Sequence, residues 1–382
     1  MQHREPAWVD AATHWAGAYL HIPFCASVCP YCDFAVVEGR DDVVGRYIEA
    51  IEQEIARESE WRSLDAIFVG GGTPSHVDPD LLGRLLHELR ERYGFAPDAE
   101  VTLEANPEDW TSDRATRLVH AGFTRVSFGA QSFDDHVLSY LGRRHTSNEA
   151  IEAVSVARAG GFGSVGIDLI MGSPGESLDS WRGTVETAVG LEIDHVSAYG
   201  LTVERGTPLG RAVAAGAAAP DPDDQADKYE HAQQAFTTAG LFQYEVSNYA
   251  RIGHECRYNL TAWAQGEYLA FGMGAHGHRH GRRTWRVRRL DTYLELVEGG
   301  ESPVQGSERL EGDAREHERL MVGLRRTAGV VAGPLGDAWA SSIEGRRFGD
   351  AGVVAYEAGR LVVRRHLLTD AVIRSVLAME LD

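Results

Sequence analysis

The sequence predicts an α/β fold built around a parallel sheet. Between residues 16 and 205, short runs typical of strands alternate with longer helical ones, as in repeated βα units. Helices are expected at 42–57 and 79–92, among others, and six strands at residues 18–22, 66–69, 100–104, 125–128, 166–170 and 195–199. The 382 residues, 43% of them hydrophobic, are enough for a main domain and a smaller one.

Three of the four cysteines follow the first predicted strand. Cys25, Cys29 and Cys32 lie within eight residues, and only Cys256 is distant. Thiolates hold iron–sulfur clusters. Three of them without a nearby fourth would leave one iron of a [4Fe-4S] cube open to a non-protein ligand. The spacing therefore predicts a cluster used for catalysis or sensing.

Two other uses of these cysteines are open to the sequence alone. A structural zinc ion takes four ligands, so His21 or Asp33 would have to complete the set from the same short loop. A disulfide framework is less favoured, because the clustered cysteines are three and the chain has only four. Reduced thiols and an N-terminus without the apolar stretch of a signal peptide predict a cytoplasmic protein.

Unusual residues also follow the other predicted strands. Active sites of parallel βα folds lie at the carboxyl ends of the strands, and these segments are therefore expected to converge on one rim. Asp168 lies on the fifth strand, and the other segments that end or follow strands are 70–75, 104–107, 129–132, 172–175 and 199–200.

Glycines and polar side chains on this rim are candidate ligand contacts. The glycines at 70–72 let the backbone approach a ligand, but the triplet lacks the ending of a P-loop, and loop geometry alone could explain it. Buried charge must be paired or bound to a ligand. A structural ion pair with Arg125 or Arg143 is the alternative for the carboxylates. The polar candidates are Glu104, Gln131, Arg143 and Asp168.

The second half of the chain has a different composition. Residues 210–224 are rich in Ala, Gly, Pro and Asp and predict a linker or the start of a helix. Residues 229–240 are helical, 244–249 are a strand or loop, and 268–278 are glycine-rich and aromatic. From about residue 311, helical segments with Gly-Val-Val and Leu-Val-Val runs predict a small α/β cap of winged-helix type.

Charge restricts the partners. The formal net charge of −20 opposes binding to the phosphate backbone of nucleic acid. The chain has no run of about 18 apolar residues, the length that a transmembrane helix needs, so at most a peripheral membrane contact is expected. A local basic patch is either a solvated face or a docking site for carboxylates of a ligand or of an acidic redox partner. It surrounds Trp285 and consists of Arg279, Arg282, Arg283, Arg286, Arg288 and Arg289.

The cysteine loop resembles that of the radical S-adenosylmethionine (radical SAM) enzymes. They share the Cys-x3-Cys-x2-Cys spacing with an aromatic residue, here Tyr31, before the last cysteine. The resemblance implies a partial (βα)6 barrel with a C-terminal cap, and a fourth iron chelated by the amino and carboxylate groups of S-adenosylmethionine. It also implies reductive cleavage to a 5′-deoxyadenosyl radical, for which the protein supplies positioning and exclusion of water.

The resemblance also implies a set of contacts to S-adenosylmethionine. The turn at 71–73 would bind the methionine amino group, and the polar strand-end residues would hold the ribose hydroxyls and the methionine carboxylate. The guanidinium of Arg143 suits a carboxylate, and His21 and Tyr31 are expected to tune the cluster through hydrogen bonds. The expected contacts are Tyr19, Tyr31, Gly71, Gly72, Thr73, Glu104, Gln131, Arg143 and Asp168.

Residues 19–25 and 32–34 are similar to one branch of this superfamily, the oxygen-independent coproporphyrinogen III dehydrogenases (HemN) and the heme chaperones (HemW). The dehydrogenases carry a further cysteine where this chain has Phe34, which favours the chaperones. The resemblance covers most of residues 16–375. It implies an N-terminal extension (1–15), a radical SAM core barrel (16–210), a linker and barrel-flanking segment (211–305) and a C-terminal cap (306–382).

One motif departs from the chaperone pattern. The chaperones carry His-Asn-x-x-Tyr-Trp, and its histidine is implicated in holding heme, whereas this chain has Tyr258-Asn-Leu-Thr-Ala-Trp263. Heme iron is ligated by Tyr as well as by His or Cys, so the expected heme region is Tyr258, Asn259 and Trp263. Packing of Tyr258 against Trp263, loss of heme handling, and a role for Cys256, His254 or His276 are the alternatives.

Three functions follow from the resemblance. The first is a chaperone that binds heme and transfers it to an acceptor protein, with a reducing electron donor such as a flavodoxin or ferredoxin. The second is an oxygen-independent coproporphyrinogen III dehydrogenase, which decarboxylates propionates. The third is a cluster-bearing sensor without radical turnover. The sequence does not decide whether the chain is an enzyme.

Overall fold

A large, mostly parallel sheet dominates the computed structural model, which describes residue 12 and residues 14–379. The strands of this sheet are β1 (Ala16–Ile22), β4 (Leu64–Gly71), β5 (Phe95–Ala105), β6 (Arg125–Gln131), β7 (Ser164–Met171), β8 (His195–Gly200), β9 (Phe242–Gln243), β10 (Asn248–Ala250), β11 (Glu267–Phe271), β12 (His276–Arg279), β13 (Arg282–Arg286) and β14 (Val304–Glu308). Their order across the sheet is β14-β13-β12-β11-β1-β4-β5-β6-β7-β8-β10-β9. The predicted α/β class is confirmed.

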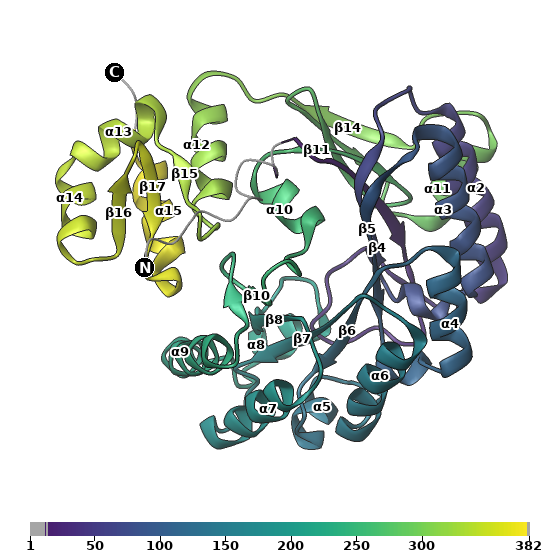
Figure 1. The fold of residues 1–382 in the computed structure, drawn as a ribbon, viewed down its shortest axis with the longest axis horizontal. Coiled ribbons are helices and arrows are strands. Elements are labelled where there is room, and N and C mark those ends of the chain that lie inside the picture. Colours follow the sequence, from purple (N-terminus) through teal and green to yellow (C-terminus); the bar gives the residue numbers. More distant parts are fainter. Residues whose placement is uncertain (1–11, 13, 380–382) are drawn as a thin grey trace.

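The six predicted strands form the middle of this sheet. They correspond to β1, β4, β5, β6, β7 and β8, and each pairs in parallel with the next. Their carboxyl ends therefore lie along one edge. Figure 1 shows the sheet curving like part of a barrel, with the connecting helices outside it. No closed barrel is needed to gather the strand ends.

The helices are placed between the strands as βα units require. They are α2 (Val44–Arg57), α3 (Pro79–Tyr93), α4 (Ser112–Ala121), α5 (Asp135–Tyr140), α6 (Ser147–Gly160), α7 (Leu178–Gly190), α8 (Pro208–Ala214), α9 (Pro222–Thr238), α10 (Arg257–Trp263) and α11 (Leu290–Glu298). Local sequence fixes their starts. Thr146 and Glu149 form a capping box at α6, and Asp78 caps α3, whose first residue is a proline.

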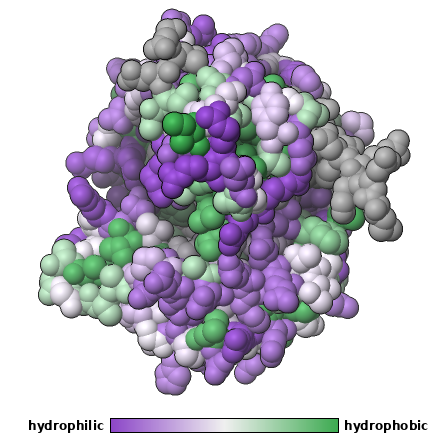
Figure 2. Space-filling view, turned by 90° about the vertical axis from the view of Figure 1, so that its left-hand side faces the viewer, coloured by the Kyte–Doolittle hydropathy of each residue, from purple (hydrophilic) through white to green (hydrophobic). Residues whose placement is uncertain are grey.

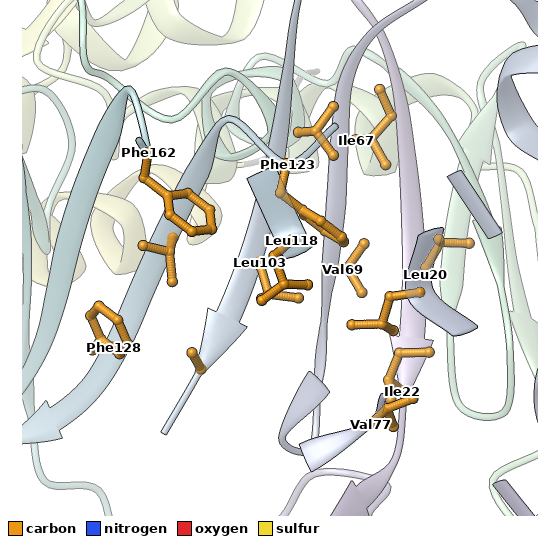
Figure 3. Packing of buried hydrophobic residues seen from close by; sticks show 14 of the residues in the cluster. Leu20, Ile22, Ile67, Val69, Val77, Leu103, Leu118, Phe123, Phe128 and Phe162 are labelled. Atoms are coloured by element: carbon orange, nitrogen blue, oxygen red, sulfur yellow. The ribbon is translucent and has the colours of Figure 1, made fainter. Parts of the chain in front are cut away.

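The main hydrophobic core lies between the sheet and the outer helices. Parallel strands covered by helices are apolar on both faces, and β1 is buried along nearly its whole length. Figure 3 shows strand side chains meeting residues of α4 and of the loops at 123 and 162. Burying each such aliphatic or aromatic side chain contributes about 1.5–3 kcal/mol. The residues labelled there are Leu20, Ile22, Ile67, Val69, Val77, Leu103, Leu118, Phe123, Phe128 and Phe162.

The glycine-rich segment at 268–278 contributes strands that the sequence analysis did not place. Strand β11 pairs in parallel with β1 and so becomes the seventh parallel strand. The antiparallel strands β12, β13 and β14 then extend that end of the sheet. The segment at 210–224 contains the end of α8 and the start of α9. A strand far along the chain thus lies directly beside the strand that precedes the cysteines.

The C-terminal part of the chain has its own sheet and core. Strands β15 (Val330–Val331), β17 (Arg360–Val363) and β16 (Val354–Glu357) form an antiparallel sheet. A separate hydrophobic cluster lies between this sheet and its helices, as expected for a small α/β cap. The helices are α12 (Gly312–Gly323), α13 (Gly333–Ser341), α14 (Ile343–Asp350) and α15 (Thr369–Leu377). Figure 2 views the molecule from the left-hand side of Figure 1 and shows that hydrophilic residues cover most of the face seen there.

The division of the chain at residues 210 and 305 stays a prediction, and most of the expected extension at 1–15 lies outside the described residues. None of the helices described in residues 14–379 combines the length and the apolar character that crossing a bilayer requires.

Candidate functional site

A cavity of about 160 Å³ opens at the carboxyl ends of the parallel strands. It contains eleven of the residues predicted as cluster or S-adenosylmethionine contacts, drawn from six separate segments of the chain. They are Cys25, Cys29, Tyr31, Cys32, Gly71, Gly72, Thr73, Glu104, Gln131, Arg143 and Asp168. Tyr19 lines an adjoining cavity instead. We call these the first and the second cavity.

The cysteine loop begins as β1 leaves the sheet. A short parallel pair closes it, formed by β2 (Phe24–Cys25) and β3 (Val37–Glu38). The Thr73 hydroxyl donates a hydrogen bond to Cys25 Sγ at 3.4 Å, and the Arg143 guanidinium donates one to Cys29 Sγ at 3.3 Å. Donors aimed at sulfur favour the thiolate form that binds metal.

Burial disfavours the thiolate form of Cys25 and Cys32 in the ligand-free protein. Burial raises the pKa of Cys25 to about 11 against the Thr73 hydrogen bond, and the neighbouring Cys32 and Cys29 contribute to this rise. Burial also raises the pKa of Cys32. A bound cationic cluster reverses this, because it stabilises the thiolates. In the described residues all four cysteines are free thiols.

The spacing of the side chains bears on the zinc alternative. Within residue 12 and residues 14–379, no three His, Cys, Asp or Glu side chains are grouped as ligands of a single metal ion. The three thiols instead line the wall of one cavity. An iron–sulfur cube suits this arrangement, because each of its cysteines binds a different iron.

The glycine turn after β4 lies against the cysteine loop. Gly72 donates its N–H to the Ile22 carbonyl at 2.8 Å. A Cβ on Gly72 would lie 2.6 Å from the backbone of Pro23 and 3.0 Å from Cys25 Sγ. Gly71 has φ of +114°, and a Cβ there would lie 2.5 Å from the His21 ring. Only glycine fits between these two segments.

Two carboxylates, one on β5 and one on β7, line the first cavity. Glu104 Oε2 accepts the Gly71 N–H at 2.9 Å, and Asp168 Oδ1 accepts the Ser127 hydroxyl at 3.1 Å. Burial raises the pKa of Glu104 to about 7 against the Gly71 hydrogen bond, and Asp168 adds to the rise. Burial likewise raises the pKa of Asp168.

Neither carboxylate forms the structural ion pair that was the alternative. Within residues 14–379, no ion pair involves Glu104 or Asp168, and Arg125 pairs with Glu100 at 3.5 Å instead. The two side chains therefore keep acceptor oxygens directed at the cavity. Such oxygens suit hydroxyl groups or a cationic group of a ligand.

Arg143 and Gln131 also line the first cavity, and Gln131 ends β6, the strand between those of Glu104 and Asp168. Arg143 donates to Asn106 Oδ1 at 2.6 Å and to the Gly129 carbonyl at 2.9 Å, while its buried Nε has no hydrogen-bond partner. Gln131 has φ of +65°, after an irregularity in the β6–β7 register between Phe128 and Gln131. A non-glycine residue in this conformation carries strain, which is typical of functional sites.

Asn106 is a site residue that the sequence analysis missed as a contact. Its amide donates to the Thr73 hydroxyl at 3.3 Å and accepts from Arg143, so it links two sides of the first cavity. The available signal was its position at the end of β5, in the 104–107 segment.

The second cavity, of about 340 Å³, adjoins the first and shares Phe34, Gly71 and Glu104 with it. Phe34 is 66% exposed. The cavity is lined mainly by aromatic rings, imidazoles and one guanidinium. Its other members are Tyr19, His21, Asp33, Ala35, Tyr258, Tyr268, Gly274, His276 and Arg288.

His21 has both ring nitrogens occupied. Nε2 lies 2.7 Å from the Ala35 carbonyl, which can only accept, so Nε2 carries the proton. Nδ1 then accepts from the Tyr19 hydroxyl at 3.1 Å. Burial lowers the pKa of His21 to about 4, so the ring is neutral at physiological pH. This pair fixes the cysteine loop to β1.

The expected heme region is only partly assembled. Tyr258 lines the second cavity, where its ring packs against Tyr19, Phe68 and Tyr268 at centroid distances of 5.9, 5.2 and 5.5 Å. Asn259 and Trp263 do not line that cavity. The Arg325 guanidinium lies over Trp263, 5.6 Å from its ring centroid. The described contacts of the Tyr258 ring are therefore mainly packing contacts with other aromatic rings.

The fold pairs three of the six arginines around Trp285 with carboxylates. Arg279 pairs with Glu58 at 3.4 Å, Arg283 with Glu308 at 2.8 Å, and buried Arg286 with Glu54 at 2.8 Å. Arg282 and Arg289 remain exposed on the surface. Exposed Arg288 donates to the Asp33 carbonyl at 2.8 Å and lines the second cavity. A single docking surface of six arginines therefore does not form.

Comparisons with known proteins agree with this geometry. The profile of the Radical SAM superfamily matches residues 19–188. The heme chaperone HemW of Mycobacterium tuberculosis (strain CDC 1551 / Oshkosh) is 41% identical over 372 residues, 94% of each chain. HemW of Bacillus subtilis (strain 168) is 34% identical over 334 residues, 86% of this chain and 88% of the relative.

A solved structure is similar along nearly the whole chain. Coproporphyrinogen III oxidase (HemN) from Escherichia coli, a radical SAM enzyme, matches with a TM-score of 0.82 and covers 97% of this chain and 92% of its own. The identity is 22%, so the likeness is one of fold.

Proposed function

The chain belongs to the radical SAM superfamily and, within it, to the family of HemW heme chaperones. We propose that it binds heme beside a [4Fe-4S] cluster and S-adenosylmethionine, and that it passes the heme to an acceptor protein. One observation carries the proposal. The cavity with the cysteines and the aromatic second cavity share a wall. Binding of a ligand in one cavity would therefore affect the binding of a ligand in the other.

We assign the first cavity to the cluster and S-adenosylmethionine. Cys25, Cys29 and Cys32 would bind three irons, and Arg143 and the Gly71–Glu104 wall would position S-adenosylmethionine. When bound, the cluster supplies an electron to the sulfonium. Thr73 and Arg143 direct donors at two of the sulfurs, which favours the thiolates.

We assign the second cavity to heme. Its volume is in the range of ligand sites, and its rings offer flat apolar walls to a macrocycle. Arg288 would face a propionate. The side open to solvent would leave part of the heme accessible, as transfer to another protein requires. The further partners in this proposal are a heme-acceptor protein and a reducing electron donor in the cytoplasm.

The proposal is tested by anaerobic reconstitution with iron and sulfide, followed by titration with hemin watched by absorbance. Wild type is expected to bind about one hemin and to release it to excess apomyoglobin. A double variant, Tyr258→His with Ala262→Tyr, restores the chaperone motif. Binding by the double variant and none by wild type would contradict the proposal and show that heme handling has been lost.

Cysteine variants separate the cluster from heme. Cys25→Ala is expected to abolish the cluster absorbance after reconstitution, because it removes one of three thiolate ligands. Cys256→Ala is the matched control, since buried Cys256 lines neither cavity. Its cluster content should equal that of wild type.

A further inference from the structure

We propose that His276 would hold the heme iron in this chain, in place of the motif histidine that is Tyr258 here. The inference rests on the proposed function and names a ligand within the second cavity. A side chain that binds the iron must line that cavity and must have a ligating atom that no protein hydrogen bond occupies.

The other candidates are occupied or distant. Cys256 is 2% exposed and lines neither cavity. His254 does not line the second cavity, and its Nδ1 lies 3.8 Å from Asp194 Oδ2. His21 reaches the cavity, but both of its nitrogens are used by Tyr19 and Ala35. None of the three offers a free donor atom to a ligand in the second cavity.

Tyr258 reaches the cavity but is poorly suited to bind iron. Its ring is packed among three other aromatic rings. Burial raises the pKa of Tyr258 well above its usual value, with the charge of nearby Tyr268 adding to the rise. A tyrosine binds ferric iron as the phenolate, and this environment disfavours that form.

His276 is free and correctly placed. It lines the second cavity, is exposed, and within residues 14–379 neither of its ring nitrogens has a hydrogen bond to the protein. Its ring lies nearly parallel to that of Trp285, at a centroid distance of 6.3 Å and an angle of 26°. The indole therefore orients the imidazole without using either nitrogen.

The backbone brings His276 to the cysteine loop. It is the first residue of β12, directly after the turn that follows β11. Gly274 in this turn has φ of +68°, and a Cβ there would lie 2.7 Å from the Cβ of Ala35. The turn thus packs closely on the loop that carries Asp33 and Phe34.

The state of the His276 ring supports a ligand role. Metal binding requires the neutral imidazole. Partial burial lowers the pKa of His276, and the charges of Arg283, Arg288 and Arg286 lower it further. The lone pair is thus available at physiological pH.

The test is hemin titration of the full-length protein with absorbance and electron paramagnetic resonance spectra. His276→Ala is expected to weaken hemin binding roughly tenfold or more, to shift the Soret band, and to recover the wild-type spectrum when imidazole is added. His276→Gln, which keeps the bulk beside Trp285, should show the same loss. Tyr258→Phe should leave the spectrum unchanged.

The matched control is His280→Asn, on the same hairpin. His280 is exposed, does not line the second cavity, and has φ of +52°, which asparagine tolerates. An unchanged spectrum in His276→Ala, or a shift in Tyr258→Phe alone, would overturn the ligand assignment while the proposed function stands. Absence of hemin binding by wild type would overturn both.

Discussion

At the scale of single residues, the buried carboxylate of Glu104 destabilises the ligand-free protein when it is ionised. Its pKa is raised to about 7, chiefly by burial, from an ordinary value of 4.5. The folded protein therefore holds this proton at higher pH than the unfolded chain does, and stability is lost as the pH rises from about 4.5 to 7. Glu104→Gln removes that loss and still accepts the Gly71 N–H.

The expected result has two parts. In the ligand-free protein, urea unfolding at pH 8 should show Glu104→Gln more stable than wild type by on the order of 2 kcal/mol, with no gain at pH 4.5. Calorimetry of the reconstituted protein should show S-adenosylmethionine binding weakened by roughly tenfold or more, because an ionised acceptor is lost. A variant that binds normally would contradict the assigned role.

Glu100→Gln is the matched control on the same strand. Glu100 pairs with Arg125 and accepts the Arg257 N–H, and it does not line the first cavity. Removing its charge leaves the buried guanidinium of Arg125 without the carboxylate that pairs with it, while the Ser164 hydroxyl and the His254 carbonyl still accept from Arg125. Stability should therefore fall while S-adenosylmethionine affinity stays at the wild-type value, the opposite of the Glu104→Gln result.

At the scale of elements, the β12–β13–β14 hairpins position His276 through one contact. Trp285 pairs with His276 on one side and with Gly306 on the other. A Cβ on Gly306 would lie 2.4 Å from Trp285 Cζ2. Gly306→Ala is expected to displace the indole, to cost about 1–3 kcal/mol in thermal or urea unfolding, and to shift the Soret band of the hemin complex.

Gly183→Ala provides the comparison for this substitution. Gly183 lies in α7, and a Cβ there would meet nothing within 4 Å. Alanine should leave stability unchanged or raise it by up to about 1 kcal/mol, because glycine is unfavourable inside a helix. Equal stability of Gly306→Ala and wild type would mean that the indole moves without cost.

At the scale of the whole molecule, a buried polar network fastens the added strands to the core. Glu54 of α2 accepts from Arg286 at 2.8 Å, from the Tyr293 hydroxyl at 2.8 Å and from the Gly272 N–H at 2.9 Å. Glu54→Gln would leave Arg286, which is 4% exposed, without a counter-charge. We expect a loss of about 3–5 kcal/mol in urea unfolding.

A surface pair on the same helix shows what burial adds. Glu52 of α2 pairs with half-exposed Arg84 at 2.7 Å. Glu52→Gln should cost less than about 1 kcal/mol, because solvent screens such a pair. Equal losses in the two variants would mean that the Glu54 network is no more important than a surface ion pair.

The sequence by itself determined the order of the βα units and the chemistry of the cysteine loop. Apolar runs that end in glycine or polar residues predict strands with a functional edge. The structure places eleven of the predicted cluster and cofactor residues along one cavity and Tyr19 in the adjoining one. These signals are local, since spacing and turn chemistry act within a few residues. They can therefore be recognised in the sequence without knowledge of the rest of the fold.

Only the tertiary structure decided which distant segments meet. It placed β11 beside β1 and brought His276 and Arg288 into one cavity with Phe34. It also paired three of the six arginines of the basic patch with carboxylates from other elements. It also put Tyr258 into an aromatic cluster. Each of these depends on contacts between residues far apart in the chain, whose pairing is set by packing of the whole sheet and not by local pattern.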